Sequence, residues 1–118
     1  MDETELLVNR IKEGIQEKKG KRITIVDMNN IESICSYFVI CEGTSNTQIM
    51  AITDSIEDYV RKTTGEKPIA TDGIGNATWI AMDYGDVIVH IFEPASRTYY
   101  NLEHLWSDAI LTDIPDLV

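Results

Sequence analysis

The chain has 118 residues, of which 43% are apolar, and its 20 acidic and 10 basic residues give it a net charge of −10. This length and apolar content suit one domain, residues 1 to 118, and no apolar run approaches the roughly 18 residues that a membrane span requires. The negative charge disfavours direct binding to nucleic acid, which needs clustered lysine and arginine, and it favours a basic protein surface as a partner.

The first segment predicts a helix over residues 3 to 19. Apolar side chains recur there at every fourth position, at Leu7, Ile11 and Ile15. Asp2 and Glu5 have the spacing of a capping box at the start of this helix. The opening sequence MDETELL is acidic and lacks the basic region of a signal peptide, so we expect a cytoplasmic protein.

Two strands and a second helix are expected next. Residues 22 to 28 alternate apolar and polar side chains, which predicts a strand, and the nearly continuous apolar run 36 to 42 predicts a buried strand. Cys41 lies in that run and is interpreted as a small buried hydrophobe. Ser45 stands at an N-cap position, and the apolar stripe from Ile49 to Val60 predicts the helix that follows it.

The most distinctive stretch runs from Thr78 to Trp106. Two apolar runs, residues 78 to 82 and 87 to 92, flank the break Asp83-Tyr84-Gly85-Asp86 and predict a β-hairpin. Alternation along the two strands separates their side chains onto two faces. One face is expected to hold Thr78, Ile80, Met82, Val87, Val89 and Ile91, and the other Trp79, Ala81, Asp83, Ile88, His90 and Phe92.

The end of the chain predicts a last helix and a frayed tail. The helix is expected to start near Pro94, which suits a first helical turn, and to include Trp106 as a core residue beside Leu102 and Leu105. Residues 113 to 118 are expected to fray. With a short strand at 69 to 71, the order is α-β-β-α-β-β-β-α. This predicts an α/β (α+β) fold, with a single mixed β-sheet of about five strands and helices packed on it.

Two places could carry chemistry, and each also has an ordinary structural explanation. Gly43-Thr44-Ser45 can hold an anion at a helix N-terminus, or can be a turn glycine with an N-cap serine. Asp27, Asp83 and Asp86 could hold Mg²⁺, but acidic residues beside a hairpin glycine are usual in turns. The sequence shows no Walker motif, no cluster of zinc ligands and no recognisable Ser-His-Asp triad. We therefore predict no enzyme, no metal and no cofactor, and an aromatic-rich face that binds protein.

Three segments resemble one known family. The first is similar to the segment of that family that leads from a strand into a helix, and it consists of Tyr37-Phe38-Val39-Ile40 followed by Gly43-Thr44-Ser45. More specific are Asp83-Tyr84-Gly85-Asp86-Val87-Ile88-Val89-His90 and Arg97-x-x-Tyr100-x-Leu102-Glu103-x-Leu105-Trp106. On these residues the chain, from residue 3 to about 110, resembles the ribosomal silencing factors, the Iojap group of bacteria and organelles. It departs at Asp72-Gly73, where the family usually has Glu-Gly, so that the acidic side chain is shorter.

The resemblance implies a fold related to nucleotidyltransferases without their catalytic acids. It also implies a translational repressor that binds the large ribosomal subunit through ribosomal protein L-fourteen. Such a repressor blocks joining of the small subunit when nutrients are short. Family members are also linked to large-subunit assembly and to homodimers. The alternatives are therefore an assembly factor, or an enzyme of the nucleotidyltransferase type that keeps its active site.

The hairpin and the last helix supply the residues expected to contact the ribosomal protein. Tryptophan, tyrosine and arginine dominate the energetics of protein interfaces, and acidic side chains would pair with basic groups of the partner. A core hairpin with a docked helix would explain the same density of aromatic residues, and both explanations can hold because a hairpin has two faces. The expected contact residues are Trp79, Asp83, Tyr84, Asp86, His90, Arg97, Tyr99, Tyr100 and Glu103.

Overall fold

The computed structural model describes residues 2–29, 35–75, 78–105 and 108–117. Its core is one six-stranded sheet with the strand order β3-β4-β5-β2-β1-β6. The central pair β2–β5 is parallel and the other pairs are antiparallel. The predicted single mixed sheet is confirmed, with six strands in place of about five. The elements are α1 (Glu3–Glu17), β1 (Lys21–Asp27), β2 (Tyr37–Glu42), α2 (Asn46–Thr64), β3 (Ala70–Asp72), β4 (Trp79–Asp83), β5 (Val87–Phe92), α3 (Pro94–Tyr100), the 3₁₀ turn η1 (Leu102–His104) and β6 (Ile110–Ile114).

Local sequence signals fix the ends of the two long helices. The Asp2 carboxylate accepts a hydrogen bond from the backbone N–H of Glu5 at 2.8 Å, as the capping-box spacing predicted. At the start of α2, the Ser45 hydroxyl accepts from the Gln48 N–H at 3.1 Å. Gly65 ends α2 in the left-handed region, at φ 81°, where glycine has no steric penalty. Gly43-Thr44-Ser45 therefore has the capping role that the structural interpretation gave it.

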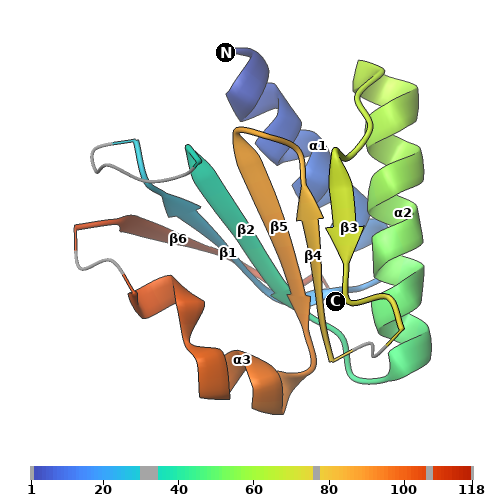
Figure 1. Cartoon of the computed structure of the whole chain (residues 1–118), viewed down its shortest axis with the longest axis vertical. Helices are drawn as coiled ribbons and strands as arrows, with labels where there is room; N and C mark the ends of the chain where they lie inside the picture. The colour runs from blue at the N-terminus through green and yellow to red at the C-terminus, as the bar shows by residue number, and fades with distance from the viewer. Residues whose placement is uncertain (1, 30–34, 76–77, 106–107, 118) are drawn as a thin grey trace.

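Helices α1 and α2 cover one face of the sheet, and α3 lies on the other (Figure 1). The helices meet closely at Gly14, where a Cβ atom would lie 3.1 Å from the Ile56 Cα atom. The Ser55 hydroxyl donates to the Gly14 carbonyl at 2.7 Å at the same crossing. The core on this face includes Ile11, Ile15, Ile49, Ile52, Ile56, Cys41, Val89 and Ile91, all without measurable exposure. Within the described residues, no helix is long and apolar enough to cross a bilayer.

The hairpin has the two faces that its alternation predicted. Its register pairs Trp79 with Phe92 and Asp83 with Ile88. Ile80, Met82, Val87, Val89 and Ile91 belong to the core under α1 and α2. Phe92, with the partly buried Trp79 and Ile88, belongs to a second core on the α3 face, together with Val26, Met28, Phe38 and Ile40. The sheet is therefore apolar on both sides, and this second core is the base of the candidate site.

Two expectations for the end of the chain are wrong. Residues 110 to 114 form β6 on the free edge of β1, so Asp113 and Ile114 belong to a strand and not to a frayed tail. The Asp113 carboxylate accepts from the Thr24 hydroxyl at 2.7 Å, which ties the strand to β1. The last helix is also shorter than expected, because Asn101 adopts left-handed geometry at φ 50° and ends α3. The expected core position of Trp106 lies outside the described residues.

Candidate functional site

An aromatic patch lies where α3 meets the ends of β4 and β5. The Trp79 ring stacks on Phe92, with centroids 5.2 Å apart, and lies 4.6 Å from the Tyr100 ring. Tyr99 packs edge-on against Tyr100 at 5.0 Å. Tyr99 is 81% exposed and Tyr100 45% exposed, whereas Trp79 is partly exposed. We call Trp79, Tyr99 and Tyr100 the aromatic patch, since they present large rings to solvent from a packed base.

His90 supports this patch from beneath. Its side chain is only 6% exposed, and its Nδ1 atom accepts a hydrogen bond from Trp79 Nε1 at 3.0 Å. That bond assigns the ring proton to Nε2. Burial lowers the pKa of His90 to about 4, so the ring is neutral near pH 7. The neighbouring rings of Phe38 and Trp79 lie against it, so His90 is buried, and its expected direct contact with a partner stays a prediction.

Arg97 is also a buried residue that supports the patch, and its expected contact with a partner stays a prediction. It is 3% exposed, and it lies on the inner side of α3. Its Nε atom donates to Glu103 at 3.1 Å, and one terminal nitrogen donates to the Thr24 hydroxyl at 2.9 Å. The other terminal nitrogen donates to the Arg22 carbonyl and lies 3.5 Å from a Glu42 oxygen. These bonds join α3 and η1 to β1 and β2, which explains why Arg97 and Glu103 occur together in the motif.

The hairpin turn carries the acidic residues at the opposite end of β4. The Asp83 carboxylate accepts from the Gly85 N–H at 2.7 Å, and Gly85 has φ 89°, so this aspartate shapes the turn. Asp86 is exposed. Tyr84 is 6% exposed and packs in the core under α1 and α2, and its expected contact with a partner stays a prediction. Trp79 and Asp83 are four residues apart on one strand, or about 13 Å.

An uncovered part of the sheet connects the aromatic patch with the turn. The register places Ala70 beside Asp83 and Asp72 beside Ala81, all on the face that holds Trp79. Ala70 and Asp72 are exposed, and Ala81, Asp83 and Ile88 are partly exposed. We call these five residues the open face. Sequence reasoning missed Ala70 and Asp72 as site residues, because only the pairing of the three-residue strand β3 with β4 brings them there.

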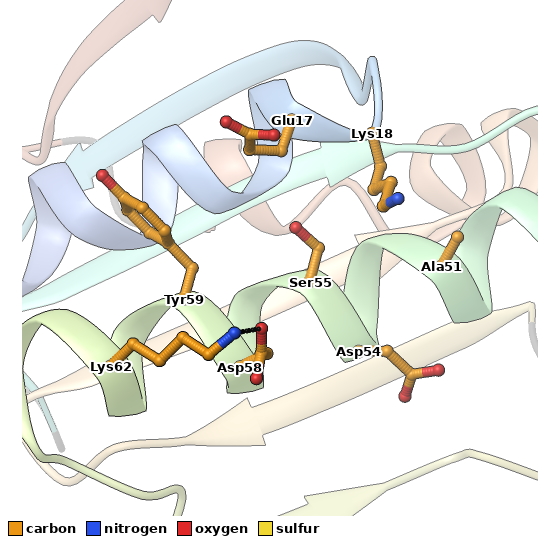
Figure 2. A pocket seen from close by; sticks show the side chains of 8 residues that line it. All are labelled: Glu17, Lys18, Ala51, Asp54, Ser55, Asp58, Tyr59 and Lys62. Atoms are coloured by element: carbon orange, nitrogen blue, oxygen red, sulfur yellow. Dashed lines mark ion pairs between the residues drawn. The ribbon is translucent and has the colours of Figure 1, made fainter.

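A groove of about 670 Å³ lies elsewhere, along α1 and α2 (Figure 2). Several of its polar side chains bind to one another or to the rest of the protein. Lys62 pairs with Asp58 at 2.9 Å, and the Tyr59 hydroxyl donates to Glu13 at 2.8 Å. Among the described residues, no three histidine, cysteine, aspartate or glutamate side chains gather as a metal-binding group. The aromatic patch and the open face are therefore the better candidate site, with the properties of a protein interface.

Comparison with known proteins identifies relatives that belong to one family. The profile of the family described as "Ribosomal silencing factor during starvation" matches residues 1–118. The ribosomal silencing factor RsfS of Bacillus subtilis is 40% identical over 83% of this chain and 82% of its own length. The factor of the same name from Halalkalibacterium halodurans is 33% identical over 89% of each chain. A crystal structure of a protein from Chromobacterium violaceum superposes with a TM-score of 0.84 at 28% identity, over 100% of this chain and 94% of the other.

Proposed function

The chain belongs to the family of ribosomal silencing factors, and on that premise we propose how it regulates translation. It binds the large ribosomal subunit through ribosomal protein L-fourteen and blocks association with the small subunit when nutrients are limited. The family name describes regulation and not catalysis, and the proposed action needs no reaction. A 13.3 kDa body held where the small subunit docks acts as a steric competitor. Its effect depends on its affinity and concentration. It acts in the cytoplasm, where its target is found.

The observation that carries this proposal is the aromatic patch on its rigid base. Trp79 is fixed by its hydrogen bond to His90 and by stacking on Phe92. Rings that are already ordered lose little conformational entropy on binding. Tyr99 and Tyr100 add exposed area, and aromatic residues of this kind are enriched among the side chains that dominate interface energies.

Charge supports a ribosomal protein, and not ribosomal RNA, as the surface that is bound. The open face carries Asp72 and Asp83, and the exposed Asp86 lies at the turn beside it. Within a net charge of −10, these carboxylates complement lysine and arginine of a basic protein and repel phosphate. Binding to bare RNA should therefore be weak, and tight binding in a gel shift with RNA alone would count against the proposal.

Co-sedimentation with isolated ribosomal subunits tests the function and the site together. Wild type should pellet with large subunits and not with small ones. The double variant Tyr99→Ala, Tyr100→Ala should bind at least about thirtyfold more weakly, because loss of central aromatic anchors costs about 2 kcal/mol or more. The matched control is Tyr59→Ala on α2, which removes a partly exposed tyrosine from another surface.

The outcomes separate function from site. If wild type pellets with large subunits and both variants pellet equally well, the function stands and the aromatic patch is not the contact. If wild type does not pellet with large subunits, the silencing proposal fails. Homodimer formation, which the family resemblance also predicts, stays a prediction, and analytical ultracentrifugation of the purified protein measures it.

A further inference from the structure

The segment between α1 and β1 is a basic stretch in an acidic chain. It holds four of the ten basic residues, all within residues 18 to 22. Lys19 and Arg22 are exposed, and Lys21 is partly exposed. Among the described residues, the ammonium groups of Lys19 and Lys21 form no ion pair, although the chain has twice as many acidic as basic side chains. We call Lys19, Lys21 and Arg22 the basic segment, since their charges stay available to a partner.

The backbone holds the basic segment in a form that its residues do not favour. Lys19 and Arg22 adopt left-handed geometry, at φ 59° and 51°, where glycine is the usual residue. The pairing of β1 with β2 shifts its register at the same place. Gln48 Nε2 donates to the Lys19 carbonyl at 3.1 Å, and the Asp116 carboxylate accepts from the Arg22 N–H at 2.8 Å. The segment is therefore ordered before a partner binds, which lowers the entropy lost on binding.

The strand register places the basic segment at the same end of the sheet as the aromatic patch. Lys21 pairs with Glu42 on β2, and Glu42 pairs with Phe92 on β5. Phe92 in turn pairs with Trp79 on β4, so the four residues form one row across the sheet. Three strand spacings separate Lys21 from Trp79, or about 14 Å. A partner bound to the aromatic patch therefore has the basic segment at its border.

Ordinary structural roles explain only part of the basic segment. Cations are favoured at the C-terminus of a helix, which accounts for Lys18 and Lys19 after α1. Lys18 also lines the groove between α1 and α2, on the helix side of the sheet (Figure 2). Arg22 pairs with the buried Glu42 carboxylate at 2.7 Å. Neither role covers Lys21, which stands on a strand and forms no ion pair within the described part of the chain.

We propose that the basic segment binds phosphate groups of the ribosomal RNA that borders the ribosomal protein held by the aromatic patch. Its ammonium and guanidinium groups meet phosphate oxygens, and each contact releases counterions from the RNA. This inference rests on the proposed function, because the large subunit brings the RNA to the edge of the patch. The net charge of −10 still repels free RNA. The contact forms on the subunit because binding through the aromatic patch raises the effective concentration of nearby phosphates.

The sign of a charge change separates an RNA contact from a solvated surface. The double variant Lys19→Gln, Lys21→Gln should bind large subunits about fivefold more weakly than wild type. If these lysines face only solvent, their loss makes the chain more acidic and leaves its affinity for a basic protein unchanged or higher. Lys19→Arg, Lys21→Arg keeps both charges and should bind like wild type. The matched control Lys62→Gln removes an exposed cation from α2 and should not weaken binding.

The salt dependence of the same affinities reports the number of phosphates that are bound. The logarithm of Kd rises linearly with the logarithm of the salt concentration, with a slope of roughly 0.7 to 0.9 for each neutralised phosphate. This slope should fall by about 1.5 in Lys19→Gln, Lys21→Gln, and it should keep the wild-type value in Lys62→Gln. All variants should have the denaturation midpoint of wild type, because the substituted side chains lie at the surface.

Cross-linking identifies the bound partner directly. A thiol-bearing imidoester attached to lysine amines keeps their positive charge and links them to adjacent RNA bases under ultraviolet light. In the complex with large subunits, peptides with Lys19 or Lys21 should carry ribonucleotides in mass spectrometry, whereas peptides with Lys62 should not. Cross-links to ribosomal protein alone, or a double variant that binds as tightly as wild type, would overturn the inference and leave the proposed function standing. If wild type does not bind large subunits, the proposed function fails, and this inference fails with it.

Discussion

Replacing Arg97 with alanine should detach α3 from the sheet and destabilise the whole domain. The guanidinium bonds to Glu103 at 3.1 Å and to the Thr24 hydroxyl at 2.9 Å, and it lies 3.5 Å from Glu42. The side chains of Arg97 and Glu42 are 3% and 6% exposed. Removing the arginine leaves the Glu42 and Glu103 carboxylates with fewer partners in a poorly hydrated place. The aromatic patch loses its base, since Tyr99 and Tyr100 follow on the same short helix.

The expected loss is about 3–5 kcal/mol, the range for removing one partner of a buried ion pair. A domain of this size has roughly 5–15 kcal/mol of total stability, so the variant should remain folded only marginally. Arg97→Lys should lose less, because lysine keeps the charge but not the planar fork of donors. The control Lys62→Ala removes a cation that is 68% exposed and pairs with Asp58 at 2.9 Å (Figure 2). An exposed pair of this kind contributes little to stability.

Urea denaturation followed by circular dichroism measures all three variants, with the free energy of unfolding obtained by linear extrapolation. The order of stability should be wild type and Lys62→Ala together, then Arg97→Lys, then Arg97→Ala. A free energy of unfolding for Arg97→Ala within about 1 kcal/mol of wild type would refute the reasoning. It would show that α3 is held by the packing of Tyr100 against Trp79 and Phe92 instead of by the buried polar network.

Three further outcomes are expected. Burial lowers the pKa of His90 from 6.5 to about 4, so the unfolded chain binds a proton first as the pH falls. The stability that depends on a neutral His90 is fully present above about pH 6.5 and is lost progressively towards pH 4, by up to about 3 kcal/mol. Acid denaturation, together with NMR titration of the His90 ring, measures this loss. Burial raises the pKa of Cys35 to about 11 and of Cys41 to about 12, so neither thiol should react at neutral pH in the native protein. Rapid labelling before unfolding would contradict this. Tyr59→Phe should lose stability with its bond to Glu13, whereas Tyr84→Phe should lose none, and equal losses in urea would contradict the distinction.

Much of the fold could be predicted from the sequence, because its signals are local. The caps at Asp2 and Ser45 act within one helical turn, and the two faces of the hairpin follow from alternation along each strand. Strand β6 could not be predicted in this way. All its side chains except Ile114 are exposed. It pairs with the edge of β1 through backbone bonds and the Asp113–Thr24 contact, and no apolar pattern marks such a strand.

The candidate site was harder to predict, because the side chain of a motif residue can point either way. Tyr84 and Arg97 have exposed neighbours in the sequence and His90 is a polar residue in an apolar strand, yet all three are buried. Alternation placed His90 on the same face as Trp79, but it could not show that Phe38 and Trp79 lie against that ring. Arg97 is polar enough to suggest the surface, and only its partners on β1 and β2 explain how a buried guanidinium is tolerated.

The buried residues of the site explain how a small domain can present a firm interface. Trp79 is held from below by His90 and Phe92 and from the side by Tyr100. Tyr100 in turn depends on α3, and α3 depends on Arg97 and its contacts with β1 and β2. A binding surface supported in this way loses little entropy when a partner binds. Substitutions at His90 or Arg97 should therefore weaken binding without touching the partner, and Tyr99→Ala should weaken it without affecting the fold. Measuring stability and subunit affinity for the same variants separates these two classes.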